Sequence, residues 1–363
     1  MYKFKKIIFD LLPFGLIRNI QAKRYPNKSI LINYQNLPDI SDCCSKFKHV
    51  VSVQGTGFSG SGAIVDLLRE YSCCLTLGSV DKEGSKTVGP PMTNGEIDFL
   101  RHSGGLFEIE HYLDDNNLFT KDALIKRFEK MVNSNAFFKH NQIKILTRQF
   151  YNQLIALEID TKGHSDYNSH LLNPLYPNTN IKVMRFFSLS KYRDLCRRYV
   201  TSVFNVFGRD GIDYLVLDQL CGDFNYDNDR NLQYIPNLKT IFVFRDPRDT
   251  YTYAVSKDIP WIPHDTVDKY ILWYKINLRK VDFASEDYLI IRFEDLVLNY
   301  DKNVKIVEEY LELTEKKHTK KKENFAPSES IRNISIWKTL EGHQCELDKI
   351  KEKLPEFCYN CDE

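Results

Sequence analysis

The chain has 363 residues, of which 42% are hydrophobic, and its 50 basic and 49 acidic side chains leave a net charge of +1. This length and composition suffice for one large or two small domains with a buried core. A net charge so close to zero gives no general attraction to nucleic acid, so we expect no nucleic-acid partner. No run of about 18 apolar residues predicts a transmembrane helix, and no cleavage site indicates a signal peptide, which favours a cytoplasmic protein.

Two further features bear on location and metal content. Nine cysteines without the spacing of a secreted scaffold predict reduced thiols. Cys358 and Cys361 have the spacing of half a zinc site, but zinc needs two more ligands, and we expect no metal.

Residues 1–18 mix basic and large apolar side chains. They suit either a peripheral helix on a membrane surface or packing on the domain, and both interpretations stay open.

Residues 50–68 read in order as a buried strand, a glycine-rich turn and the start of a helix. The glycines let consecutive backbone N–H groups converge beside a helix N-terminus, where the helix dipole also favours an anion. The glycines are Gly55, Gly57, Gly60 and Gly62. The turn lacks the lysine of an ATP-type loop, G-x-x-x-x-G-K-[ST], which argues against an ordinary nucleoside triphosphatase. The alternative is a tight turn that binds nothing.

Residues 240–244 form an apolar run of strand length, which breaks at the sequence Arg245-Asp-Pro-Arg-Asp249. Pro247 ends the strand, so the arginines lie at the carboxyl edge of the predicted sheet, where α/β proteins bind ligands. A guanidinium group pairs well with phosphate because it donates two parallel hydrogen bonds. The alternative is an ion pair at the strand end, between Arg245 and Asp249 or Asp246.

Together, these two patterns resemble the sulfotransferases that use 3′-phosphoadenosine 5′-phosphosulfate (PAPS). Further segments resemble the family in the same order: residues 268–273, residues 287–297 with the sequence Arg-Phe-Glu-Asp-Leu-Val, and residues 330–340. The resemblance implies a three-layer α/β/α fold with a central parallel sheet, of the P-loop NTPase-like type. It also implies an N-terminal segment at 1–45, a sulfotransferase domain with acceptor-binding inserts at 46–350 and a tail at 351–363.

The resemblance further implies which residues bind PAPS. The first loop holds the 5′-phosphosulfate in that family, a strand-end arginine with a later serine holds the 3′-phosphate, and the last segment covers the cofactor. The residues carried over are Gly57, Phe58, Ser59, Gly60, Ser61, Gly62, Ala63, Arg245, Tyr253, Arg332, Trp337 and Lys338.

This sequence departs from the family pattern at three positions. Phe58 stands where the loop usually has a basic residue, Tyr253 where a serine is usual, and Ser335 where a glycine is usual. The cation missing from the loop must therefore come from elsewhere. The candidates from the sequence are Lys82, Lys86, Arg148 and Arg185.

Sulfuryl transfer to a hydroxyl also needs a base that accepts the acceptor's proton. Residues 106–112 alternate apolar and polar, which predicts a strand with Glu108 and Glu110 on one face. Glu110, Glu108 and His111 are therefore the candidate bases. Residues 213–220 predict another strand, and Asp218 and Gln219 at its end suit a catalytic or acceptor contact. Helical patterns at 120–132 and 190–207 are expected to cover the sheet, and residues 316–323 predict a charged, solvated loop.

The sequence therefore predicts a PAPS-dependent sulfotransferase that needs no metal and acts on a hydroxyl of a polysaccharide or glycolipid. Large inserts and 21 tyrosines, some of which can stack on sugar faces, favour the sugar acceptor. Two alternatives remain. One is a nucleotide-dependent kinase of the same fold, and the other is a noncatalytic membrane-surface protein of a glycan-assembly complex.

Overall fold

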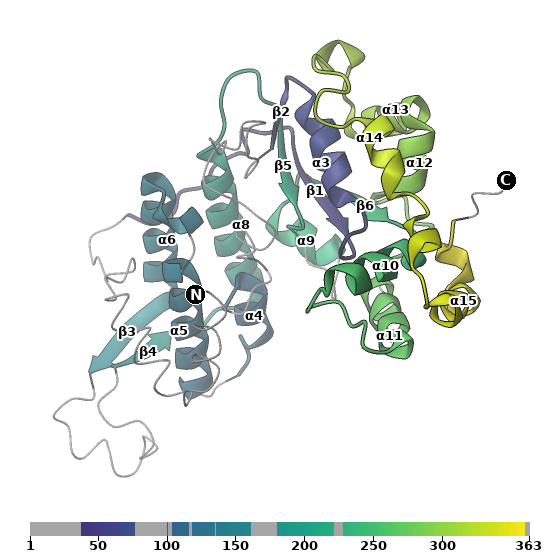
Figure 1. The fold of residues 1–363 in the computed structure, drawn as a ribbon. Helices are drawn as coiled ribbons and strands as arrows, with labels where there is room; N and C mark the ends of the chain where they lie inside the picture. The colour runs from purple at the N-terminus through teal and green to yellow at the C-terminus, as the bar shows by residue number, and fades with distance from the viewer. Residues whose placement is uncertain are drawn as a thin grey trace, which may run out of the picture.

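The protein is described by a computed structural model over residues 38–76, 100, 104–115, 118–134, 136–160, 180–220, 228–279 and 281–359. Its centre is a parallel sheet of five strands in the order β2-β5-β1-β6-β7 (Figure 1). The strands are β1 (His49–Gly55), β2 (Cys74–Thr76), β5 (Tyr214–Asp218), β6 (Leu238–Phe244) and β7 (Leu289–Arg292). The central strands are buried over most of their length, as expected for a sheet covered on both faces.

Helices cover both faces of the sheet. Val51 and Val53 of β1 share one buried cluster with the helices α3 (Ser61–Arg69), α12 (Phe293–Leu298) and α13 (Tyr300–Leu311). Val50 belongs to the second cluster, with α8 (Leu189–Asn205), α10 (Pro247–Lys257) and α11 (Val267–Leu278). Neighbouring residues of β1 thus enter different cores, because successive side chains of a strand point to opposite faces. The predicted three-layer α/β/α fold is confirmed.

A helical insert lies between β2 and β5 in the chain and to one side of the sheet in space (Figure 1). It comprises α4 (Leu106–His111), α5 (Leu118–Ser134), η1 (Ala136–Lys139), α6 (Asn141–Leu154) and the antiparallel pair β3 (Ile155–Asp160) and β4 (Asn180–Met184). The buried rings of Phe128, Phe150 and Tyr199 join α5, α6 and α8, with Phe150 and Tyr199 stacked at 4.3 Å. The helices predicted at 120–132 and 190–207 correspond to α5 and α8.

The strand predicted at residues 106–112 is wrong, because these residues form the helix α4. Leu106 and Ile109, three residues apart, are both fully buried, which is helical rather than strand spacing. The two glutamates pair with arginines of different helices, Glu108 with Arg127 and Glu110 with Arg193. Residues two apart on a helix point in different directions, so this arrangement suits a helix and not one face of a strand.

The remaining elements follow β7 in the chain, apart from α9, which lies between β5 and β6. They are α9 (Asn228–Tyr234), η2 (Glu315–Lys317), α14 (Pro327–Ser330), η3 (Ile331–Asn333), η4 (Ile336–Thr339), α15 (Gln344–Lys353) and η5 (Pro355–Phe357). The boundary expected after residue 350 falls inside α15, and the backbone N–H of Tyr359 donates to Asp246 at 2.9 Å. The described part of the expected tail therefore packs on the same body as the sheet.

Several predictions concern segments that the structure does not describe. Residues 1–18, Lys82, Lys86 and Cys361 lie outside the described residues. Among the helices that are described, none has the length and apolar character required to cross a bilayer.

Candidate functional site

The loop between β1 and α3 is a tight turn that leads into the first turn of the helix. The backbone N–H of Ser59 donates to Thr56 O at 3.0 Å, and that of Ala63 donates to Gly60 O at 2.9 Å. Gly60 has a φ of +92°, and a Cβ at this position would overlap the ring of Phe293. Only glycine fits both the backbone conformation and the space. A Cβ on Gly62 would meet no atom within 4 Å, so the space beside the start of α3 is open.

A cavity of about 880 Å³ lies at the carboxyl ends of β1, β5 and β6, within the size range of small-molecule sites. The chain adds β2 and β5 on one side of β1 and then β6 and β7 on the other, so the cavity lies where the strand order reverses. Among the described residues, its lining includes the glycine loop without Ser59, the end of β5, Arg245 and parts of the 324–333 segment. The two predicted anion-binding patterns therefore meet in one cavity.

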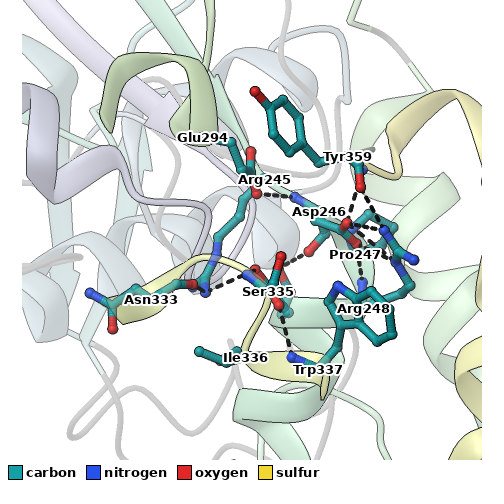
Figure 2. Close-up of polar contacts among 12 residues, drawn as sticks. Arg245, Asp246, Pro247, Arg248, Glu294, Asn333, Ser335, Ile336, Trp337 and Tyr359 are labelled. Atoms are coloured by element: carbon teal, nitrogen blue, oxygen red, sulfur yellow. Dashed lines mark hydrogen bonds and ion pairs between the residues drawn. The ribbon is translucent and has the colours of Figure 1, made fainter. Parts of the chain in front are cut away.

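Arg245 lies at the end of β6 and is only 6% exposed. Figure 2 shows its side chain reaching toward Asn333, whose carbonyl oxygen accepts a hydrogen bond from one guanidinium nitrogen. The same nitrogen lies 3.4 Å from an Asp249 carboxylate oxygen, and the guanidinium carbon lies 5.2 Å from the centroid of the Phe293 ring. The guanidinium Nε is buried without a hydrogen-bond partner among the described residues. A buried cation with an unused donor, lining a cavity, fits an anionic ligand.

Arg248, three residues further on, is equally buried but fully occupied by the protein (Figure 2). Its Nε and one Nη donate to the Asp246 carboxylate at 3.0 and 2.6 Å, and the same Nη donates to Tyr359 O at 2.9 Å. The guanidinium carbon lies 4.2 Å from the centroid of the Trp337 ring. Of the strand-end ion pairs considered as an alternative, Arg245 forms the one with Asp249, whereas Asp246 pairs with Arg248; of the two arginines, Arg245 lines the cavity.

Asp249 fixes the last of the predicted cofactor-binding segments. Its fully buried carboxylate accepts the backbone N–H of Ser335 at 2.9 Å and of Trp337 at 3.0 Å, and burial raises its pKa. Ser335 takes a left-handed φ of 58°, a conformation that glycine adopts at less cost than serine. Arg332 lines the cavity, whereas Trp337 packs on Arg248 and the Lys338 ammonium lies 5.5 Å over the Trp337 ring.

Two buried glutamates that the sequence did not reveal position the cavity walls. Glu294 is fully buried, accepts the backbone N–H of Asp246 at 2.9 Å, and has a pKa raised to about 7 by burial. Glu70, at the end of α3, is also fully buried. It accepts the backbone N–H groups of Lys322, Asn324 and Phe325 and a hydrogen bond from His318 at 2.7 Å.

Glu70 thereby anchors the charged loop. The lysines of residues 316–323 are exposed as predicted, while the carboxylate holds the backbone inward and sets the two following residues against the cavity. Glu294 stands in the Arg-Phe-Glu-Asp-Leu-Val segment and Glu70 in no such pattern, but the sequence predicts the role of neither, since their partners lie 48 to 255 residues away.

Phe58 of the loop and Tyr253 of α10, two of the positions that depart from the family pattern, contact each other. Their ring centroids lie 4.3 Å apart, and Phe58 also stacks on Trp261 at 5.2 Å with an interplanar angle of 21°. All three residues line the cavity. Ser59, by contrast, turns its side chain beneath the loop toward Gly55, so a cofactor contact from this residue is limited to its backbone.

None of the three candidate bases lines this cavity. Glu110 accepts hydrogen bonds from Arg193 at 2.9 and 3.0 Å and from the Tyr234 hydroxyl, and it lies 3.3 Å from Arg230. Burial alone would raise its pKa, but these partners outweigh burial and lower it.

The other two candidates also have positions elsewhere. Glu108 accepts from Gly104 N at 2.5 Å and from Arg127 at 2.6 Å, which ties the start of α4 to α5, and His111 is exposed beside Tyr112. The residues at the end of β5 do line the cavity: Asp218 is the last residue of the strand, and Gln219 donates to Ser61 Oγ at 3.2 Å.

The two candidate loop cations that the structure describes, Arg148 and Arg185, do not line the glycine-loop cavity. Arg185 lines a different cavity, of about 1290 Å³, beside β3 and α8, and Arg148 belongs to α6. Among the described residues that line the glycine-loop cavity, the basic side chains are Arg245 and Arg332.

No protein-family model and no curated protein matches this sequence. Solved structures similar to it include sulfotransferase STF1 from Mycobacterium tuberculosis H37Rv, at 13% identity and a TM-score of 0.37, over 92% of this chain and 79% of that one. A second is the sulfotransferase domain of the Synechococcus PCC 7002 olefin synthase, at 11% identity and a TM-score of 0.40, over 86% of this chain and 94% of that one. A third is the sulfotransferase domain of the curacin biosynthetic pathway, at 14% identity and a TM-score of 0.40, over 85% of this chain and 97% of that one. These similarities are too low to support more than the sequence and the geometry themselves support.

Proposed function

We propose that this protein is a PAPS-dependent sulfotransferase that acts on a hydroxyl of a polysaccharide or glycolipid. The observation that carries the proposal is Arg245, a buried arginine that lines the cavity together with the glycine loop and has an unused Nε. The donor carries anionic groups at two separate positions, a 3′-phosphate and a 5′-phosphosulfate. An arginine and a loop of backbone donors facing one cavity match such a ligand.

The loop also meets the donor's requirements in detail. Thr56 lines the cavity, is 3% exposed, and its hydroxyl is buried without a hydrogen-bond partner in the described part of the chain. The open space beside Gly62 leaves room for an anion at the start of α3. Bound PAPS supplies the sulfuryl group, and the residues of the chain hold its phosphates, orient it and accept the proton of the acceptor hydroxyl.

We assign proton acceptance to Asp218. Among the described residues, the acidic side chains that line the cavity are Asp66, Asp218 and Glu329. Asp66 is held by Arg69 at 2.7 Å, and Glu329 lies exposed on the short helix α14. Asp218 ends the strand beside β1, and its neighbour Gln219 contacts the loop residue Ser61, so it lies next to the proposed sulfuryl position.

Replacing Asp218 separates binding from chemistry. Asp218→Asn is expected to lower turnover about 100-fold or more, the usual loss for a general base, while leaving the affinity for 3′-phosphoadenosine 5′-phosphate (PAP) within about twofold. Turnover is measured as transfer of labelled sulfate from PAPS to a panel of glycans. A large loss of PAP affinity would instead make Asp218 a structural part of the donor site.

Calorimetric titration of the purified protein with PAP, and with ATP plus magnesium, tests the proposal against its two alternatives. We expect PAP to bind and ATP to bind far more weakly, because the loop lacks the lysine that holds the outer phosphates of ATP. Preference for ATP with magnesium would support the kinase. Binding of neither nucleotide would contradict the proposal and favour the noncatalytic protein.

A further inference from the structure

Three aromatic side chains lie in contact along one side of the cavity. Phe58 lies between Tyr253 and Trp261, and all three line the cavity. They come from the glycine loop, from α10 and from the segment after α10, so tertiary packing alone brings them together. We call these three residues the aromatic wall.

The glycine loop separates the aromatic wall from the side of Arg245. A Cβ on Gly57 would overlap the indole ring of Trp261, whereas a Cβ on Gly60 would overlap the ring of Phe293. Arg245 lies over that same Phe293 ring. The buried cation therefore belongs to one side of the loop, and the aromatic wall to the other.

Trp261 is unusually open for a stacked tryptophan. It is 55% exposed, although Phe58 and the backbone at Gly57 pack against it. An exposed indole that lines a cavity offers a flat apolar surface to a ligand. Phe58 is also held at a φ of 58°, a conformation that costs a residue with a Cβ on the order of 1 kcal/mol. A strained aromatic residue kept beside a cavity indicates a function at that place.

The chemistry of the wall suits a sugar ring. The face of an aromatic ring is partly negative and attracts the weakly positive C–H groups on the flat side of a sugar. Sugar hydroxyls need polar partners at the edge of such a platform. The segment that carries Trp261 also carries polar side chains: the Asp258 side chain is 97% exposed and lies 3.1 Å from His264 Nε2.

We propose that the aromatic wall is the acceptor subsite and binds a sugar ring on the open face of Trp261. This inference rests on the proposed function and specifies where its acceptor binds. The donor's phosphates occupy the side of Arg245, and the sugar approaches the loop from the opposite side. The inference therefore moves the side chains of Phe58 and Tyr253 from the predicted donor contacts to the acceptor.

The test compares the wild type with Trp261→Ala and Trp261→Phe. Each is titrated with cellohexaose, maltohexaose and chitohexaose by saturation-transfer NMR, and separately with PAP by calorimetry. We expect at least one hexasaccharide to bind, Trp261→Ala to weaken it about tenfold or more, and Trp261→Phe to restore part of the affinity. PAP affinity should stay within about twofold. The matched control is Phe186→Ala. Phe186 is 80% exposed and lines the other cavity, so this substitution should change neither the sugar affinity nor the PAP affinity.

The outcomes separate this inference from the proposed function. If the wild type binds none of the three sugars, or if Trp261→Ala binds them equally well, the sugar subsite is overturned. Loss of PAP affinity in Trp261→Ala also overturns it, because the wall would then hold the nucleobase. If the wild type binds no PAP but binds a sugar in a Trp261-dependent way, the subsite stands and the proposed function fails.

Discussion

A buried carboxylate of the helical insert and two buried polar groups at the carboxyl edge of the sheet differ in how fully they are paired. In the insert, the Glu110 carboxylate has hydrogen bonds or ion pairs with Arg193, Arg230 and Tyr234. At the sheet edge, Arg245 Nε and Thr56 Oγ1 are buried without a hydrogen-bond partner among the described residues. Because nearly all buried polar groups in folded proteins are satisfied, the open ones indicate where a ligand completes the structure.

The same contrast appears in the acidity of the buried carboxylates. Several hydrogen-bond donors lower the pKa of Glu110 despite its burial, so it is a stable anion within the insert. Glu294, behind the cavity, has a pKa raised to about 7 by burial, and one of its carboxylate oxygens has no hydrogen-bond partner in the described structure. The paired Glu110 carboxylate is thus structural, whereas the unpaired Arg245 Nε and Thr56 Oγ1 belong to residues that line the cavity, where a ligand can bind them.

The largest expected effect comes from Gly60→Val at the sheet edge. A side chain there would force an unfavourable φ and overlap Phe293, which closes the loop to an anion. We expect no PAP binding that calorimetry can detect, in a protein whose circular dichroism remains that of the wild type.

Gly211→Val is the matched control, because Gly211 also has a left-handed φ, of +80°, but does not line the cavity, and its Cβ would meet no atom within 4 Å. Its PAP affinity should change by no more than about fivefold, or roughly 1 kcal/mol. If Gly60→Val still binds PAP, or if the two variants lose affinity equally, the loop does not hold the anion.

In the insert, Glu110→Gln should affect stability and not binding. It leaves Arg193 and Arg230 without their common carboxylate, and we expect a loss of about 3 kcal/mol in the free energy of unfolding at pH 7, with PAP affinity within about twofold. Because the pKa of Glu110 is lowered from 4.5, its stabilisation is present above that pH and is lost as the pH falls through the folded pKa.

Urea unfolding at pH 7 and at pH 4 measures both parts of this prediction. The difference in the free energy of unfolding between the wild type and the variant should be smaller at pH 4 than at pH 7. A stable variant that has lost PAP affinity would give Glu110 a functional role after all.

A smaller effect is expected from Glu294→Gln. Since burial raises its folded pKa to about 7, the folded state keeps this proton to higher pH than the unfolded state does, and the contribution to stability falls as the pH rises from about 4.5 to 7. Glutamine can still accept from Asp246 N without a charge. Between pH 5 and pH 7, the free energy of unfolding of the variant should therefore rise by on the order of 1 kcal/mol relative to that of the wild type. If the free energies of unfolding of the two proteins change with pH in parallel, the raised pKa is contradicted.

The fold and half of the site could be predicted because their signals are local. A strand followed at once by a glycine turn, or by Arg-Asp-Pro, places backbone donors and Arg245 at the edge of a parallel sheet, and the sheet order then brings the two together. The end of β5 was predictable for the same reason, since Asp218 directly follows an apolar strand.

The rest depends on contacts between distant parts of the chain. Nothing near Glu70 predicts that it holds the backbone of residues 322–325, and nothing near Phe58 predicts its stack with Tyr253 and Trp261. The short run at 106–112 fits strand alternation as well as helical spacing, and only the arginines of α5 and α8 decide for the helix.

The assignment of Arg245 to the 3′-phosphate is tested by comparing PAP with AMP, which lacks only that phosphate. Calorimetry with the wild type should show PAP binding about 30- to 150-fold more tightly than AMP, which corresponds to roughly 2–3 kcal/mol. In Arg245→Ala this preference should fall to about threefold or less, while the affinity for AMP, which serves as the internal control for folding, stays nearly unchanged. A variant that keeps the full preference for PAP would show that Arg245 does not bind the 3′-phosphate.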